Sequence, residues 1–174
     1  MSKIVHEIIH ISKPKEGFVL FKEFSNGGRI EIHNDTEKGK SDFKDLLSIS
    51  REFAKGAKVV YILPRLHFKD KRYQEIYGGL IGTRYERKCP DLYIDGLFYE
   101  YESFRSPFKK EKIGRMIGQG TKQSSRIIIN NNKGCSERYI RRIIFERLYI
   151  GQIINEVWIY EKGKIRLLTI NKGQ

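Results

Sequence analysis

Cysteine is scarce in this chain, and its two cysteines lie far apart in the sequence. Cys89 and Cys135 are isolated, and neither belongs to a C-x-x-C motif. This spacing excludes the usual zinc knuckle and provides no disulfide framework. We therefore expect both residues to be ordinary thiols.

Histidine is also scarce, with four residues spread over the first 67 positions. His6 and His10 have the i, i+4 spacing of a helix, but no acidic or cysteine companion completes a set of metal ligands. The histidines are expected to lie on the surface or in the core. Only His33 and His67 are kept as candidate acid or base groups.

Long apolar runs are absent, and so are internal repeats, linkers and low-complexity tracts. No segment approaches the length of a transmembrane helix, and the N-terminus lacks the apolar core of a signal peptide. A chain of 174 residues with 39% hydrophobic content can bury a core without disulfides. We expect a single domain, residues 1–174, located in the cytoplasm.

Acidic residues are outnumbered by basic ones, 21 to 34, which gives a formal net charge of +13. Lysine and arginine that neutralise phosphates release counterions, so a chain of this charge favours polyanionic partners. Nucleic acid is the leading candidate. A membrane surface is the weaker alternative.

The acidic residues that are present cluster in residues 89–102, CPDLYIDGLFYEYE. Asp95-Gly96 is a strong signal for a two-residue hairpin turn between β-prone runs. With that turn, Asp91 is opposite Glu100, and Glu102 lies on the same face two residues further on. Three carboxylates are therefore predicted to converge.

Like charges that face each other destabilise a sheet unless a cation or a shared proton offsets them. The simplest interpretation is a solvated acidic face balanced by Lys88 and Arg105. The other side of the same hairpin argues against it, since it is continuously apolar, as expected of strands resting on a core. That apolar side consists of Leu92, Ile94, Leu97, Tyr99 and Tyr101.

The remaining patterns predict an α+β domain with a twisted, mostly antiparallel or mixed sheet flanked by helices. Strands are expected at residues 18–21, 29–33, 58–63, 126–129, 157–160 and 165–168. Helices are expected from Ser41 to Gly56, in a short stretch within 69–85, from Ser106-Pro107 through residue 117, and after Ser136.

A basic segment follows the acidic hairpin, because residues 105–133 contain Glu111 as their one acid. Its glycines, amides and hydroxyls around 118–126 suit phosphate or base edges, although no Walker loop is present. The alternative is a helix-to-strand connection whose polar groups satisfy the backbone. Candidate nucleic-acid-binding residues are Lys88, Arg105, Lys109, Lys112, Arg115, Lys122, Ser124 and Ser125. Four aromatic residues interleave with basic ones as candidate base-stacking groups, namely Tyr73, Tyr77, Tyr85 and Phe104.

Four short motifs, taken in order, resemble a known family. They are REFAKGAKVVYILP at 51–64, PDLYIDG at 90–96, E-x-E-S at 100–103 and KQSSRIII at 122–129. The set is similar to the C-terminal tRNA nuclease domains of bacterial contact-dependent growth inhibition toxins, which belong to the barnase, colicin and RelE-like ribonuclease fold. It spans roughly residues 27–168.

The resemblance implies a toxin-like endoribonuclease that cleaves RNA, including tRNA, in preference to DNA and without a metal. An immunity or antitoxin protein would be a partner. The beginning of the chain at Met1 favours a stand-alone or mobile-element protein. The residues expected to be catalytic are Asp91, Glu100, Glu102, Gln123 and Arg126.

One departure from that family is the acid at position 102. The usual pattern after the D-G turn is E-x-K, so Glu102 replaces a cation that would stabilise the transition state. Lys88, Lys122 or Arg126 could substitute for it in space, or activity could be lost, which would leave a non-catalytic nucleic-acid-binding protein.

The same acids are also similar to the motif of PD-(D/E)XK nucleases, some of which carry Glu in place of the lysine. In this alternative Asp91 and Glu100 bind Mg²⁺ or Mn²⁺, and Glu102 orients or deprotonates the attacking water. The metal would relieve the crowding of the carboxylates.

Overall fold

The computed structural model describes residues 16–104 and 109–170. His6, His10, Arg105 and the expected helix start at Ser106-Pro107 lie outside the described residues. Within them the chain forms one eight-stranded mixed sheet with four α-helices, so the predicted α+β class is confirmed.

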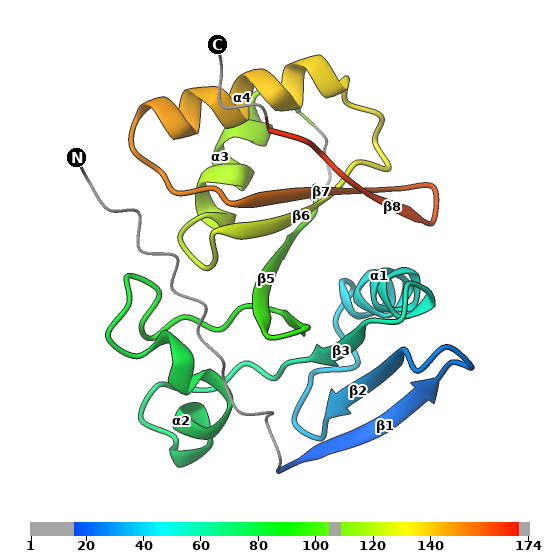
Figure 1. Cartoon of the computed structure of the whole chain (residues 1–174). Coiled ribbons are helices and arrows are strands. Elements are labelled where there is room, and N and C mark those ends of the chain that lie inside the picture. Colours follow the sequence, from blue (N-terminus) through cyan, green and yellow to red (C-terminus); the bar gives the residue numbers. More distant parts are fainter. Residues whose placement is uncertain (1–15, 105–108, 171–174) are drawn as a thin grey trace, which may run out of the picture.

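The strands follow one another across the sheet in chain order, from β1 to β8 (Figure 1). Their bounds are β1 Phe18–Glu23, β2 Arg29–His33, β3 Val59–Ile62, β4 Leu92–Ile94, β5 Leu97–Glu102, β6 Arg126–Asn130, β7 Glu156–Glu161 and β8 Lys164–Leu167. All six strands expected outside the acidic hairpin are present, with ends shifted by at most two residues.

The directions of the strands place their carboxyl ends together. β2 pairs with β3 in parallel, and β5, β6 and β7 also pair in parallel. The antiparallel strand β4 lies between β3 and β5, so β3 and β5 run the same way. Five strands therefore end at the same edge of the sheet, where open α/β sheets commonly bind ligands.

Helix α1 (Phe43–Lys55) forms because its apolar residues recur on one stripe, which buries Leu46, Ile49 and Phe53 against the sheet. The predicted N-cap at Ser41 is wrong: the N-cap is Asp42, and its side chain makes no capping hydrogen bond. Gly28 of the preceding turn allows the close approach of this helix, since a β-carbon there would lie 1.9 Å from the carbonyl oxygen of Ala54.

The other helices are α2 (Lys71–Tyr77), α3 (Lys112–Gly120) and α4 (Glu137–Tyr149). The alternation of side chains along β5 shows which face each one covers. Tyr99 and Tyr101 point into the core beneath α1, whereas Phe98 packs with the tyrosines of α2. On β6, Ile127 packs with α3 and α4. Figure 1 shows α1 on one side of β5 and both α2 and α3 on the other.

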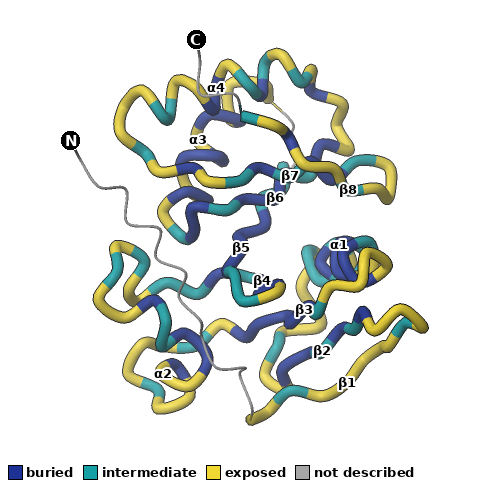
Figure 2. Tube along the Cα trace, viewed as in Figure 1, coloured by how far each residue is buried: buried dark blue, intermediate teal, exposed yellow. Residues whose placement is uncertain are grey.

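Burial is uneven across the sheet. The central strands are buried on both faces, whereas β1 at the edge is exposed along most of its length (Figure 2). The acids of the central hairpin therefore lie in the most buried part of the sheet.

Candidate active site

The acidic hairpin forms as predicted. Asp95 and Gly96 take φ angles of 45° and 89°, and the register pairs Leu92 with Tyr99. Asp91, directly before β4, is held beside β5 because its Oδ2 accepts a hydrogen bond from the backbone N–H of Tyr101 at 3.0 Å. The backbone N–H of Leu63, just after β3, donates to the Asp91 carbonyl oxygen.

The two faces of the hairpin also follow the predicted pattern. Its apolar side, from Leu92 to Tyr101, packs into the core beneath α1. Alternation places Glu100 and Glu102 on the opposite face, which is the face of Phe98. The carboxylates therefore point into the space between the α2 and α3 sides of the domain.

Glu100 is the most unusual of the three acids, because it is only 8% exposed and its Oε2 has no hydrogen-bond partner among the described residues. Burial raises the pKa of Glu100 well above its ordinary value, and the charges of Asp91 and Glu102 raise it further. An unpaired carboxyl oxygen in the interior normally costs several kcal/mol.

Asp91 titrates together with Glu100. Burial raises the pKa of Asp91 to about 6, although the Tyr101 N–H and the nearby Arg65 guanidinium oppose the shift. The two carboxyls interact directly, so their protons are released as a coupled pair rather than from either residue alone.

Arg65 is paired with one of these acids, and sequence analysis missed it. Its Nη2 lies 3.7 Å from Asp91 Oδ1, and its side chain is 61% exposed. The position after the buried strand β3 was the available signal, because the carboxyl end of β3 lies beside Asp91. No ion pair joins Lys88 or Lys122 to a carboxylate within the described residues.

Tyr77 fixes the two chain segments that enter the site. Its hydroxyl is fully buried and donates to the Pro64 carbonyl at 2.5 Å, with the Pro90 carbonyl 3.4 Å away. These prolines directly precede Arg65 and Asp91. The Tyr73 side chain is also buried, so the prediction that Tyr73 and Tyr77 stack on bases is wrong.

The C-terminal end of α3 lies against the third acid. A β-carbon at Gly120 would be 2.8 Å from Cγ and 3.0 Å from Oε1 of Glu102. Glu102 is half-buried by this contact. The glycine therefore determines where the Glu102 carboxylate can lie.

A cavity of about 550 Å³ opens at the carboxyl edge of the sheet, and Asp91, Glu100 and Glu102 are not among its lining residues. Asp42 lies between this cavity and the acids. It lines the cavity, and its charge raises the pKa of Asp91. Asp45 accepts hydrogen bonds from the Tyr101 hydroxyl and from the Asn130 amide. The complete lining is Ser41, Asp42, Asp45, Ser103, Phe104, Asn130, Asn132 and Lys133.

The predicted phosphate-binding residues divide into two groups. Lys109 is exposed just before α3, and Lys112, Arg115 and Lys122 are exposed along or just after it. Lys88 is half-buried in the loop before β4. These lysines and arginines remain candidate phosphate contacts.

The polar residues before β6 have structural partners instead. The Ser124 hydroxyl donates to the Phe98 carbonyl at 2.8 Å, and the Ser125 hydroxyl accepts from Asn155. Arg126 pairs with Glu156 at 3.2 Å and lies near Tyr99, on the face opposite Glu100. Gln123 is half-buried in the connection from α3. The geometry of this segment matches the helix-to-strand connection considered from the sequence.

The donor set suits a small divalent cation bound jointly with a substrate. Within residues 16–104 and 109–170, no group of three or more His, Cys, Asp or Glu side chains has the geometry of a complete metal cage. Mg²⁺, however, is commonly bound by one or two carboxylates together with substrate phosphates and waters. Asp91 and the unpaired Oε2 of Glu100 are such a pair.

Comparisons with protein-family models, with curated proteins and with solved structures found no match to this chain. No helix in the described parts of the chain is long and apolar enough to cross a lipid bilayer.

Proposed function

We propose that this protein is a metal-dependent nuclease that hydrolyses a phosphodiester bond, with Asp91, Glu100 and Glu102 as its catalytic acids. The observation that carries the proposal is the buried Glu100 carboxyl with an unpaired oxygen, placed beside Asp91 in a chain of net charge +13. An acid that destabilises the fold in this way is typical of a functional site. RNA is the substrate that the family resemblance favours.

The roles of the acids follow from their positions. Asp91 and Glu100 would hold Mg²⁺ or Mn²⁺, which supplies charge neutralisation at the phosphate and a more acidic bound water. Glu102, on the same face of β5 as Glu100, would accept the proton of the attacking water. Arg65, largely exposed beside Asp91, is placed to contact a phosphate oxygen of the substrate.

Basic residues around the acids provide the electrostatic attraction for the substrate. Lys112, Arg115 and Lys122 are exposed along the α3 side, and Arg65 is exposed on the α2 side. Contacts of this kind hold the phosphate backbone and carry no base specificity. They support binding of nucleic acid on the face that carries Glu100.

A second candidate, a metal-free ribonuclease, is favoured by the pKa of Asp91. Two coupled buried carboxyls, with the pKa of Asp91 raised to about 6 and that of Glu100 raised above its ordinary value, can supply a base and an acid near neutral pH. Such a pair could take the proton of an RNA 2′-hydroxyl and protonate the leaving oxygen. DNA, which lacks that hydroxyl, would not be cleaved.

One experiment separates these functions. The purified protein is incubated with tRNA, unstructured RNA, single-stranded DNA and duplex DNA, in Mg²⁺, in Mn²⁺ and in EDTA. Cleavage that requires the metal supports the first proposal, and cleavage of RNA alone in EDTA supports the second. Binding without cleavage of any substrate contradicts both.

Matched variants identify the site in the same experiment. Glu100→Gln and Asp91→Asn keep the size of the side chain and remove its charge, so both should abolish cleavage. Glu146→Gln, on the exposed surface of α4, makes the same chemical change away from the site. Equal losses in Glu100→Gln and Glu146→Gln would contradict the assignment of the site.

A further inference from the structure

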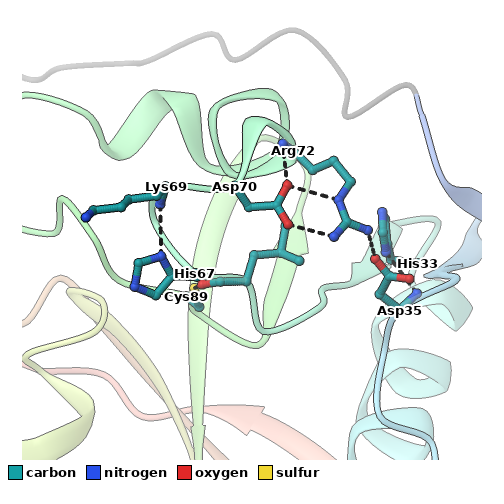
Figure 3. A network of polar contacts seen from close by, with 8 residues as sticks. His33, Asp35, His67, Lys69, Asp70, Arg72 and Cys89 are labelled. Carbon is teal, nitrogen blue, oxygen red and sulfur yellow. Dashed lines mark hydrogen bonds and ion pairs between the residues drawn. The ribbon is translucent and has the colours of Figure 1, made fainter.

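The loop that leads from Arg65 to helix α2 is held rigidly at its far end (Figure 3). Asp70 is the N-cap of α2, and its Oδ1 accepts the backbone N–H of Arg72 at 3.0 Å. The guanidinium of Arg72 joins Asp70 to Asp35, which follows β2. The loop is thus attached to the neighbouring strand as well as to its own helix.

The middle of the same loop is fixed by three further hydrogen bonds. His67 accepts the backbone N–H of Lys69 on its Nδ1 and that of Asp70 on its carbonyl oxygen (Figure 3). The thiol of Cys89 donates to the Leu66 carbonyl at 3.2 Å. The backbone on both sides of residue 68 is therefore held by hydrogen bonds.

This rigid loop holds an aromatic ring outside the core. Phe68 is 40% exposed, and cationic groups surround its ring. The Arg87 guanidinium carbon is 4.8 Å and the Lys69 ammonium 5.9 Å from the ring centroid, and the His67 ring is 4.6 Å away. An exposed aromatic ring among cations is the usual composition of a surface on which unpaired bases stack.

The ring is also connected to the candidate active site. Phe68 is three residues from Arg65, whose guanidinium contacts Asp91. Asp70, the acid within the same loop, is paired with Arg72. Arg87 lies 3.9 Å from the Glu86 carboxylate on the exposed surface, where such a pair is weak, so Arg87 and Lys69 can still attract phosphate. The loop that carries Phe68 therefore begins at a residue whose side chain contacts the carboxylate of Asp91.

From these contacts we propose that Phe68, with Arg87 and Lys69, forms a stacking platform for an unpaired base next to the scissile phosphate. The inference depends on the proposed nuclease function and specifies its substrate as single-stranded or looped nucleic acid. A paired base cannot present its face to the ring, so duplex would bind less tightly. Because hydrogen bonds and ion pairs already hold the loop, less conformational entropy would be lost on binding.

The test is the affinity of the full chain for labelled oligonucleotides, measured by fluorescence anisotropy in the Glu100→Gln background, which prevents cleavage. A single-stranded 12-mer RNA and the same sequence as a duplex are compared. We expect tighter binding of the single strand. Phe68→Ala should weaken it by about 5- to 150-fold, the range of one lost stacking contact.

Three control variants make the result specific. Phe68→Tyr keeps an aromatic face and should retain affinity, whereas Phe68→Leu keeps only apolar area and should lose it. Phe145→Ala removes a ring of equal exposure, 41%, from α4 and should have no effect. Unchanged affinity in Phe68→Ala, equal affinity for duplex and single strand, or full affinity in Phe68→Leu would each overturn the platform.

Failure of the platform can be told apart from failure of the proposed nuclease function. If wild type cleaves with metal and Phe68→Ala cleaves single strands equally well at low substrate concentration, the platform alone is wrong. If no substrate is cleaved but Phe68 governs single-strand affinity, the nuclease function is wrong and the platform stands as a binding site.

Discussion

Gly120 lies directly against Glu102, so that a β-carbon at position 120 would come within 2.8 Å of Glu102 Cγ. The neighbouring atoms belong to the end of a side chain, which can rotate away. A methyl group at this position is therefore expected to move the carboxylate rather than break the helix.

The first prediction follows from this contact. Gly120→Ala should reduce cleavage at least tenfold because a displaced Glu102 cannot reach the attacking water, while the melting temperature changes little. Alanine is also favoured over glycine in a helix. The measurement is the cleavage rate beside a thermal unfolding curve.

Gly78→Ala is the matched control for this prediction, because nothing lies within 4 Å of a β-carbon there and the backbone φ of −54° suits alanine. It should leave activity unchanged. Full activity in Gly120→Ala would show that the position of Glu102 does not matter for the reaction.

The second prediction concerns metal binding to the folded chain. Mn²⁺ or Mg²⁺ at about 100 times its dissociation constant should stabilise the wild type by about 2.7 kcal/mol through preferential binding to the native state. For a domain of this size that corresponds to a rise in melting temperature of roughly 5–10 °C. Differential scanning fluorimetry with and without metal measures it.

Glu100→Gln and Asp91→Asn should each remove this metal-dependent rise, and Glu146→Gln should retain it. A rise that persists in both active-site variants would place the ion elsewhere. If the wild type itself shows no rise, the metal-free ribonuclease becomes the better proposal.

The third prediction is a dependence of stability on pH. Asp91 and Glu100 have raised pKa values in the folded state, so the folded chain binds more protons than the unfolded chain. Their contribution to the free energy of unfolding is therefore lost as pH rises from about 4, the unfolded pKa, through about 6, the folded pKa of Asp91. For Asp91 alone the loss is on the order of 2–3 kcal/mol.

Urea unfolding at pH 4.5 and pH 7.5 in EDTA isolates this effect when wild type is compared with Glu100→Gln. The substitution removes one of the two titrating groups, so the variant should lose less stability over this interval. An identical loss of stability in both proteins would mean that ionising Glu100 in the folded state costs no free energy.

The fourth prediction concerns the basic side of α3. Lys122→Glu combined with Arg115→Glu should weaken binding of every nucleic-acid sequence alike and reduce the slope of log affinity against log salt concentration by about two. Lys162→Glu, on the exposed β7–β8 turn, is the control for reversing a charge. Unchanged affinity and slope in the double variant would place the phosphate contacts on another surface.

The hairpin was predictable from the sequence because the determinants of its register are local. The Asp95-Gly96 turn fixes which residues face each other, and the alternation of apolar and acidic residues fixes the faces. For this reason the position of Asp91 opposite Glu100 could be predicted from a stretch of twelve residues alone.

The surroundings of the hairpin were not predictable, because they depend on contacts between distant segments. Arg65 reaches Asp91 only through the pairing of β3 with β4, and Tyr77 is buried because α2 packs beneath that pair. Similarly, Arg126 was expected near the acids. Side chains alternate between the two faces of β6, however, and that of Arg126 lies on the face of Glu156. Sequence alone does not specify the order of strands in a sheet.

The burial of Glu100 has a consequence for laboratory evolution of this protein. A library selected only for resistance to heat would favour apolar residues at position 100, since they fill the same space without an unpaired oxygen. The selected variants would be more stable to heat and would lack the acid at position 100. Conversely, retention of Glu100 under that selection would require nucleic acid or metal to be present during the selection.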